Sequence, residues 1–198
     1  MSLKALFTLA AITLTLYAFI PYIRDILKGT MRPHVFSWVI WGITTFVVFF
    51  AQLAAGGGPG AWAIGLSGSI TLFIAVLAFA KRGDADITRT DWLFFLAALS
   101  SLPLWFFTAD PLWAVVVLTT VDLLGFGPTL RKAWEQPHLE SIPFFGLFLV
   151  RNLLVIGGLE KLSLTTVLFP AAVSLACAAL MLLIAGRRQA IRSARPKN

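Results

Sequence analysis

The sequence is poor in charged residues and cysteine, and each shortage excludes a class of protein or site. Only 13% of the 198 residues are charged, about half the share of an average soluble domain, which argues against such a domain. The one cysteine, Cys177, lies in an apolar run, so it excludes an intramolecular disulfide and a cysteine-type metal site. No P-loop, H-E-x-x-H, G-x-S-x-G or zinc-ligand cysteine cluster occurs. We therefore predict a protein that is not an enzyme and uses no metal or other cofactor.

Apolar residues are abundant instead. They make up 59% of the chain, with 17 Phe and 7 Trp, and the mean hydropathy is +0.87. Such side chains need burial, and a lipid bilayer offers it. A helix crosses a bilayer in roughly 20 residues, so seven spans use about 140 residues and leave short loops. We predict spans at residues 3–20, 35–54, 61–80, 92–109, 112–130, 141–159 and 162–185.

Lysine and arginine are unevenly distributed around these spans. Thirteen of the 16 lie in the loops after the first, third and fifth spans or in the tail. The positive-inside rule therefore places the N-terminus outside and the C-terminus in the cytoplasm, in what we expect to be a bacterial inner membrane. Bulky residues follow the first span, so we expect a retained helix and not a cleaved signal. The net charge of +7 favours anionic lipid headgroups as partners and does not require nucleic acid.

The loops after the first and fifth spans share a motif, which reads P-x-x-R, then P-H-x-x-S, then G. The first copy consists of Pro21, Arg24, Pro33, His34, Ser37 and Gly42, and the second of Pro128, Arg131, Pro137, His138, Ser141 and Gly146. The shared order and position indicate an internal duplication of a three-helix unit. Both copies lie on the positive side, so the two units run parallel, and the fourth span supplies the extra crossing between them.

The predicted fold is therefore all-α and integral to the membrane, with seven transmembrane helices arranged as two parallel three-helix bundles plus a linker helix. The first unit covers residues 1–80, the loop and linker helix 81–110, the second unit 111–186, and a basic cytoplasmic tail 187–198. Transporters built from such repeats bind their substrate near the middle of the membrane, where the two halves meet.

This plan, its orientation and the prolines at the cytoplasmic ends of the first and fifth spans resemble the PQ-loop superfamily. That group includes the SWEET sugar transporters and the bacterial nicotinamide riboside transporters. Tyr22 and Thr129 stand where the family has glutamine, and the third and seventh spans lack the asparagine that SWEET proteins present to the sugar. The resemblance implies transport of a small solute, with Pro21 and Pro128 acting as hinges.

Asp122 and Arg151 are charged residues inside predicted spans. A charge at this depth costs a few kcal/mol, so each should face the bundle interior and find a partner. At about 1.5 Å per residue they lie roughly 12 and 15 Å from the cytoplasmic ends of their spans, within one helical turn of each other. They form either a structural ion pair or part of a substrate or proton pathway. Asn152 could bind a polar solute or a neighbouring helix.

Four further candidates are uncharged. Trp41 lies a turn inside the second span, where its indole could stack on a sugar or heterocycle ring. Ser69 and Thr166 could line a cavity, although Ser69 also belongs to a row of small residues that is typical of close helix packing. Pro170, inside the seventh span, should kink that helix or free a carbonyl, and it is a third candidate hinge.

We predict from these residues a transporter that moves a small polar solute, such as a sugar, nucleoside or vitamin, by alternating access. The alternative is a non-transporting seven-helix receptor or assembly protein that signals through its cytoplasmic loops. A membrane enzyme ranks third, because Asp122 and Arg151 lack a recognisable nucleophile and base. The sequence leaves the coupling ion, the direction of transport and the formation of a homo-oligomer open.

Overall fold

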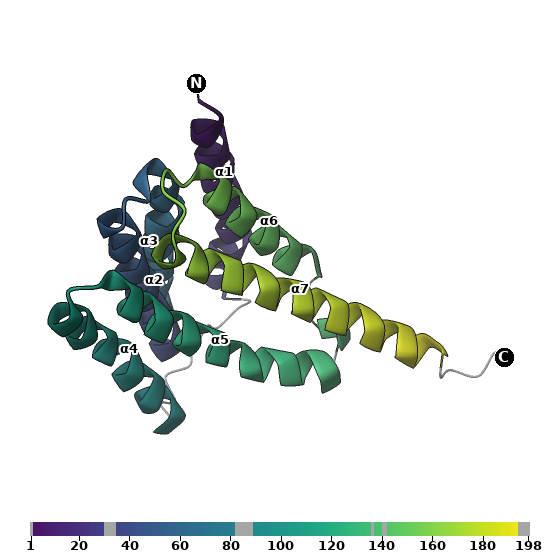
Figure 1. Cartoon of the computed structure of the whole chain (residues 1–198). Coiled ribbons are helices and arrows are strands. Elements are labelled where there is room, and N and C mark those ends of the chain that lie inside the picture. The colour runs from purple at the N-terminus through teal and green to yellow at the C-terminus, as the bar shows by residue number, and fades with distance from the viewer. Residues whose placement is uncertain (1, 30–34, 82–88, 136, 140–141, 194–198) are drawn as a thin grey trace.

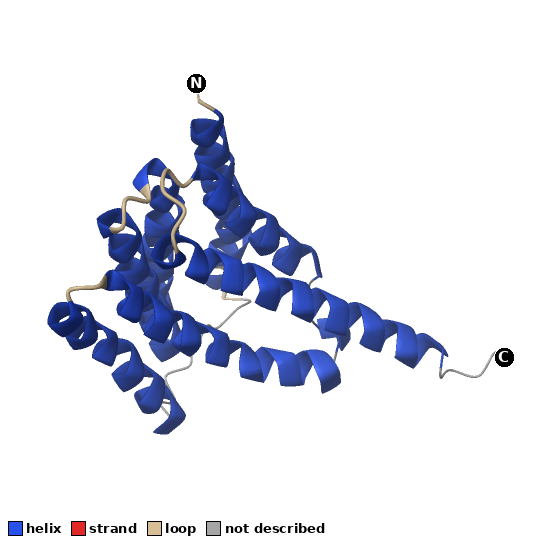
Figure 2. Cartoon of the chain, in the orientation of Figure 1, coloured by secondary structure: helices blue, strands red, loops and turns tan. Residues whose placement is uncertain are grey.

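The chain is helical through the part that the structure describes. The computed structural model describes residues 2–29, 35–81, 89–135, 137–139 and 142–193 (Figures 1 and 2). Several residues of the predicted motifs and tail lie outside these ranges: Arg32, Pro33, His34, Arg82, Ser141, Arg195 and Lys197.

Seven α-helices and two short 3₁₀-helices, with no strand, make up these described ranges. The α-helices are α1 (Leu3–Leu27), α2 (Val35–Ala54), α3 (Trp62–Ala80), α4 (Arg89–Thr108), α5 (Pro111–Glu135), α6 (Ile142–Gly158) and α7 (Leu164–Ser193). The 3₁₀-helices are η1 (Gly58–Ala61) and η2 (Pro137–Leu139).

The helices are apolar enough to indicate a membrane-embedded protein. By length and composition, three can cross a bilayer: Leu3–Leu27, Gly58–Ala80 and Leu164–Ser193. Shorter apolar helices cover Trp38–Ala54, Phe95–Thr108, Pro111–Leu124 and Ile142–Gly158. Large apolar side chains such as Phe106 and Leu182 are exposed on the surface, where hydrocarbon would surround them.

The helices begin close to the predicted spans, but three of them end later than predicted. α1, α5 and α7 continue to residues 27, 135 and 193, where the sequence predicts ends at 20, 130 and 185. Pro21 therefore lies inside α1, and Pro128 falls within the bounds of α5. A proline removes only one hydrogen bond from the helix ladder, and the amides that follow it still find their carbonyls.

The helices pack in two sets of three with the same internal order. In the first set α3 packs against both α1 and α2, and in the second set α7 packs against both α5 and α6. Between the sets, α1 packs against α6 and α2 against α5. These two contacts are equivalent if α1–α3 correspond to α5–α7. This is the packing expected of a repeated three-helix unit, with α4 placed against α5 and α2.

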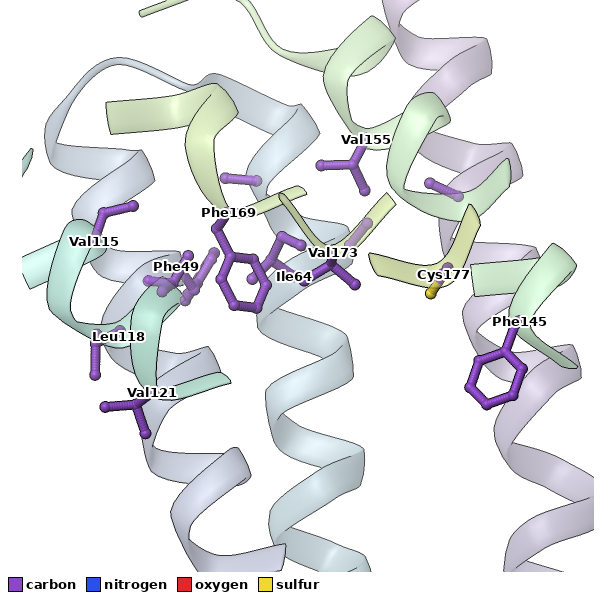
Figure 3. Packing of buried hydrophobic residues seen from close by; sticks show 14 of the residues in the cluster. Phe49, Ile64, Val115, Leu118, Val121, Phe145, Val155, Phe169, Val173 and Cys177 are labelled. Carbon is purple, nitrogen blue, oxygen red and sulfur yellow. The ribbon is translucent and has the colours of Figure 1, made fainter. Parts of the chain in front are cut away.

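An apolar core joins the two sets. In Figure 3, Phe49 of α2, Ile64 of α3 and Phe169 of α7 gather near Leu118 and Val121 of α5. All five side chains are buried, so the core removes apolar surface of both sets from their surroundings. A smaller cluster joins α1 to α3.

One end of the bundle is held together through backbone atoms. We call it the tied end and define it as residues 2–8, 56–61 and 158–163, near the N-terminus in Figure 1. The Glu160 amide donates to the Gly57 carbonyl at 3.0 Å, and Lys4 Nζ donates to the Glu160 carbonyl at 3.0 Å. A Cβ on Gly60 would collide with backbone atoms of Gly158. This approach of η1 to the end of α6 therefore requires glycine.

The opposite end, where α1, α5 and α7 finish, carries basic residues, and we call it the basic end. Arg187 Nε donates to the Trp134 carbonyl at 3.1 Å, and its guanidinium lies 4.2 Å from the centroid of the Trp134 ring. These contacts join α7 to α5 within one set. Figure 1 shows the second halves of α5 and α7 leading away from α2 and α3 towards this end.

Replacing Gly60 by alanine should destabilise the tied end. The new Cβ meets the Gly158 backbone, which cannot turn aside as a side chain would, so we expect unfolding to become easier by about 1 to 3 kcal/mol. Thermal unfolding in detergent measures the loss. Gly186→Ala is the matched control, because nothing lies within 4 Å of its Cβ and alanine favours a helix. Equal stability of Gly60→Ala and wild type would contradict the contact.

Candidate functional site

Each of the seven α-helices places a buried polar side chain at a similar depth. Counted from the tied end at about 1.5 Å per residue, these side chains lie roughly 10 to 18 Å along their helices. They are Thr15, Thr44, Thr71, Ser101, Thr119, Arg151 and Ser174. Several of the hydroxyls donate to a carbonyl of their own helix, as Thr71 does to Ser67 at 2.8 Å. A polar band therefore crosses the apolar bundle.

Arg151 of α6 is the charged member of this band, and its side chain is only 5% exposed. Its Nε donates to Thr15 Oγ1 of α1 at 3.1 Å, and its Nη2 donates to the Ala63 carbonyl of α3 at 2.8 Å. Its Nη1 donates to Asn152 Oδ1 at 3.0 Å. Neutral oxygens from three helices thus replace water around the guanidinium, whose planar fork suits several acceptors at once.

Asn152 is fully buried and serves the same arrangement. While its Oδ1 accepts from Arg151, its Nδ2 donates to the Phe148 carbonyl at 2.8 Å, one turn earlier in α6. Thr15 likewise donates to the Ala11 carbonyl at 2.8 Å. The bonds of Arg151 and Asn152 hold α6 against α1 and α3, so they join the second set to the first.

Asp122 lies on the inward face of α5. Helical spacing puts it in line with the buried Leu118 and Thr119. Its side chain is nevertheless half-buried, so packed atoms do not cover it completely. Within the described part of the chain, no group donates a hydrogen bond or forms an ion pair with this carboxyl.

The structure does not pair Asp122 with Arg151. The guanidinium donates to Thr15, Asn152 and Ala63 instead. α7 packs between α5 and α6, and Figure 1 shows it running between them. Equal depth along two helices therefore does not bring these charges together, because depth leaves the direction in which each side chain points undetermined.

Pro170 confirms one prediction, because it frees a carbonyl. It lacks the N–H that would bond to the Thr166 carbonyl in the preceding turn of α7. Gln52 Nε2 of α2 donates to this carbonyl at 2.7 Å, and Gln52 is fully buried. The sequence analysis overlooked Gln52, although an amide in an otherwise apolar span is a recognisable signal.

Thr166 has a second role at the start of α7. The Ser163 amide donates to Thr166 Oγ1 at 3.0 Å, and the Thr166 hydroxyl donates to the Lys161 carbonyl at 2.8 Å. These bonds satisfy backbone groups of the turn that leads into α7. Thr166 therefore belongs to the junction of α2 with α7.

Trp41 and Ser69 differ in their surroundings. Trp41 is half-buried and meets Trp38 edge to face, with ring centroids 5.7 Å apart. Ser69 is exposed, donates to its own helix at the Gly65 carbonyl (3.0 Å), and shares a face of α3 with the exposed Phe73. The structure thus places Ser69 on the outer surface of the bundle.

The site offers a carboxyl that can bind a positive charge or take up a proton. Within the described ranges, no group of three or more His, Cys, Asp and Glu side chains is placed to hold a metal ion. In this part of the chain, Asp122 and Thr119, one turn before it, form an adjacent pair of polar groups without a bond, whereas Arg151 and Asn152 are engaged in hydrogen bonds. Gln52 Oε1 is a further buried polar atom without a partner there, but its amide nitrogen is bonded.

Comparison of the chain with protein-family models, curated proteins and solved structures finds no match. The resemblance to the PQ-loop superfamily therefore stays a prediction. The helical packing and the contacts above are the observations on which a function is to be argued.

Replacing Thr15 by valine should destabilise the protein. Valine keeps the shape of the side chain but removes the acceptor of Arg151 Nε, and a hydrogen bond to a charged group contributes about 1.5 to 3 kcal/mol. Thr13→Val is the matched control, because Thr13 is exposed and donates only to the Leu9 carbonyl of its own helix. Thermal unfolding of both variants tests the role of Thr15, and equal losses would contradict it.

Gln52 and Pro170 should be energetically coupled. Gln52→Leu leaves the Thr166 carbonyl buried without a donor, so we expect a loss of about 1 to 3 kcal/mol. In a Pro170→Ala background, the new amide of residue 170 can bond to that carbonyl, so the same change should cost less. A double-mutant cycle from thermal unfolding measures the difference. Additive losses would show that Gln52 does not satisfy this carbonyl.

Proposed function

We propose that this chain is a transporter of a bacterial inner membrane that moves a small polar solute, such as a sugar, nucleoside or vitamin, by alternating access. The observation that carries the proposal is the equivalent packing of the two helix sets, with Asp122 unpaired on the inward face of α5. Repeated units that meet around a polar site at mid-depth are typical of secondary transporters.

The proposal includes seven spans, with the N-terminus outside and the C-terminus in the cytoplasm. The charges at the two ends support this orientation. Arg24, Arg187 and Arg188 lie at the basic end, which faces the cytoplasm by the positive-inside rule. Lys4 and Lys161 lie at the tied end, which then faces outward.

The tied end then acts as the outer gate. In this structure the gate is closed by the Gly57–Glu160 hydrogen bond and by the contact between Gly60 and Gly158. Alternating access requires the opposite conformation as well, in which the gate separates and the basic end closes.

The bond from Gln52 to the Thr166 carbonyl suits a junction that opens and closes. It joins α2 to α7 next to the gate. Because Pro170 has removed the internal partner of this carbonyl, the bond can break without disturbing the ladder of α7. Pro170 is thus the hinge candidate beside the gate, and Pro21 and Pro128 lie in the halves of α1 and α5 that lead to the basic end.

Cross-linking across the tied end tests the proposal. Lys4→Cys and Glu160→Cys, combined in a Cys177→Ala background, place two exposed thiols where Lys4 Nζ now meets the Glu160 carbonyl. We expect liposomes containing the unlinked protein to take up at least one solute from a panel of sugars, nucleosides and vitamins. A short bis-maleimide should abolish this uptake, because the gate can no longer separate.

The matched control is a second cysteine pair, Trp134→Cys with Arg187→Cys, which joins α5 to α7 inside one helix set. Linking this pair should leave uptake largely intact. Folded protein that carries no solute of the panel would favour the receptor alternative. Uptake that persists after complete linking of the tied end would contradict alternating access through this gate.

A further inference from the structure

We propose that Thr119 and Asp122 of α5 form a binding site for a monovalent cation, which is either the charged group of the transported solute or a coupling ion. The inference rests on the proposed function and deepens it, because it names the charge that the carrier recognises. Four observations carry it: an unbonded hydroxyl, an unbonded carboxyl beside it, the shortage of cations around them, and the equivalent position in the repeat.

The hydroxyl of Thr119 is buried and has no hydrogen-bond partner. Its side chain is only 4% exposed. Several other buried helical hydroxyls donate to their own helix, as Thr15 does to Ala11 and Ser174 does to Pro170 at 2.8 Å each. A buried polar atom normally has a partner, so an unbonded one marks a place where a ligand or water can bind.

Asp122 follows Thr119 by three residues, so the two side chains lie on the same face of α5. Asp122 is half-buried on this face, and no described group bonds to it. The carboxylate and hydroxyl oxygens can both act as acceptors. Two adjacent acceptors in an apolar bundle favour a ligand that brings positive charge.

The helices packed against α5 supply almost no positive charge at this depth. α2 contains no ionisable residue at all, and Cys177 is the ionisable group of α7 before its basic C-terminal turns. On α4, Arg89 lies at the first position, more than two turns from the level of Asp122, and His138 of η2 lies beyond the end of α5. Arg151 donates to oxygens on α1, α3 and α6.

The repeat shows what the equivalent position does in the first unit. Asp122 corresponds to Thr15, by the same offset of 107 residues that relates Pro128 to Pro21. Thr15 accepts a hydrogen bond from the guanidinium of Arg151. Arg151 itself corresponds to Val47 on α2. The first unit therefore has a cation from the chain against this position, and the second unit has valine where that cation would stand. A cation that binds Asp122 would thus come from outside the chain.

Thermal unfolding of the full chain in detergent tests the site without a flux measurement. The probes are the chlorides of sodium, potassium, methylammonium and choline, titrated at constant ionic strength and pH. Binding to the folded state raises the unfolding temperature in a saturable manner. We expect this rise with at least one probe for wild type and none for Asp122→Asn, which has the same shape without the charge.

Thr119→Val should weaken the apparent affinity for that probe about tenfold, since it removes one hydrogen bond or ligand oxygen. Thr120→Val is the matched control, because Thr120 is exposed and donates to the Val116 carbonyl at 2.8 Å, so its affinity should equal that of wild type. A response to sodium or potassium identifies a coupling ion, and a response to methylammonium or choline identifies a charged solute.

Three outcomes would overturn the cation site. No probe stabilises wild type; or every probe stabilises Asp122→Asn equally; or only a change of pH has an effect, so that the carboxyl takes a proton alone. None of these three outcomes bears on solute uptake by the liposomes, which tests the transporter proposal independently. Conversely, suppose that a cation raises the unfolding temperature but the liposomes take up no solute. This result would contradict the proposed transport function and would leave the cation site standing.

Discussion

A guanidinium buried among apolar helices must receive from protein atoms the hydrogen bonds that water would otherwise provide. Arg151 receives them from Thr15, Ala63 and Asn152. These groups belong to α1, α3 and α6, so satisfying one cation fixes how the second helix set lies against the first. α7 packs against both α6 and α5, and Arg151 is bonded away from Asp122.

The sequence predicts the positions of the helices well, because an apolar run and the charged or glycine-rich break that ends it depend only on neighbouring residues in the chain. It also predicts that Pro170 frees a carbonyl, since the missing N–H is a local property. The sequence predicts ends for α1 and α5 that are several residues too early. The residues that follow Pro21 and Pro128 remain helical, because a proline removes its own N–H and leaves the later amides free to bond. The sequence therefore predicts the end of a helix where a local break, such as a glycine run, stops it. It predicts the end less well where the helix continues beyond its apolar residues.

The candidate site is less predictable, because it depends on which way side chains point. Depth along the helices brings Asp122 and Arg151 to one level, but the guanidinium bonds to oxygens of α1 and α3 and the carboxyl has no bond to it. Gln52 is noticeable in the sequence as an amide in an apolar span, but its partner and the unbonded state of Thr119 depend on packing. One satisfies a carbonyl of another helix, and the other is buried without a partner. Neither fact can be read from the two residues alone.

The contact of Gly60 with Gly158 has a consequence for the way this end can come apart. Two bare backbones touch there, with no flexible side chain between them to stretch or change rotamer. Such surfaces lose about a quarter to a half of their attraction within the first ångström of separation, because dispersion falls off steeply with distance. Half-separated arrangements of this junction are therefore sparsely populated. The junction is expected to open in a two-state manner and not gradually.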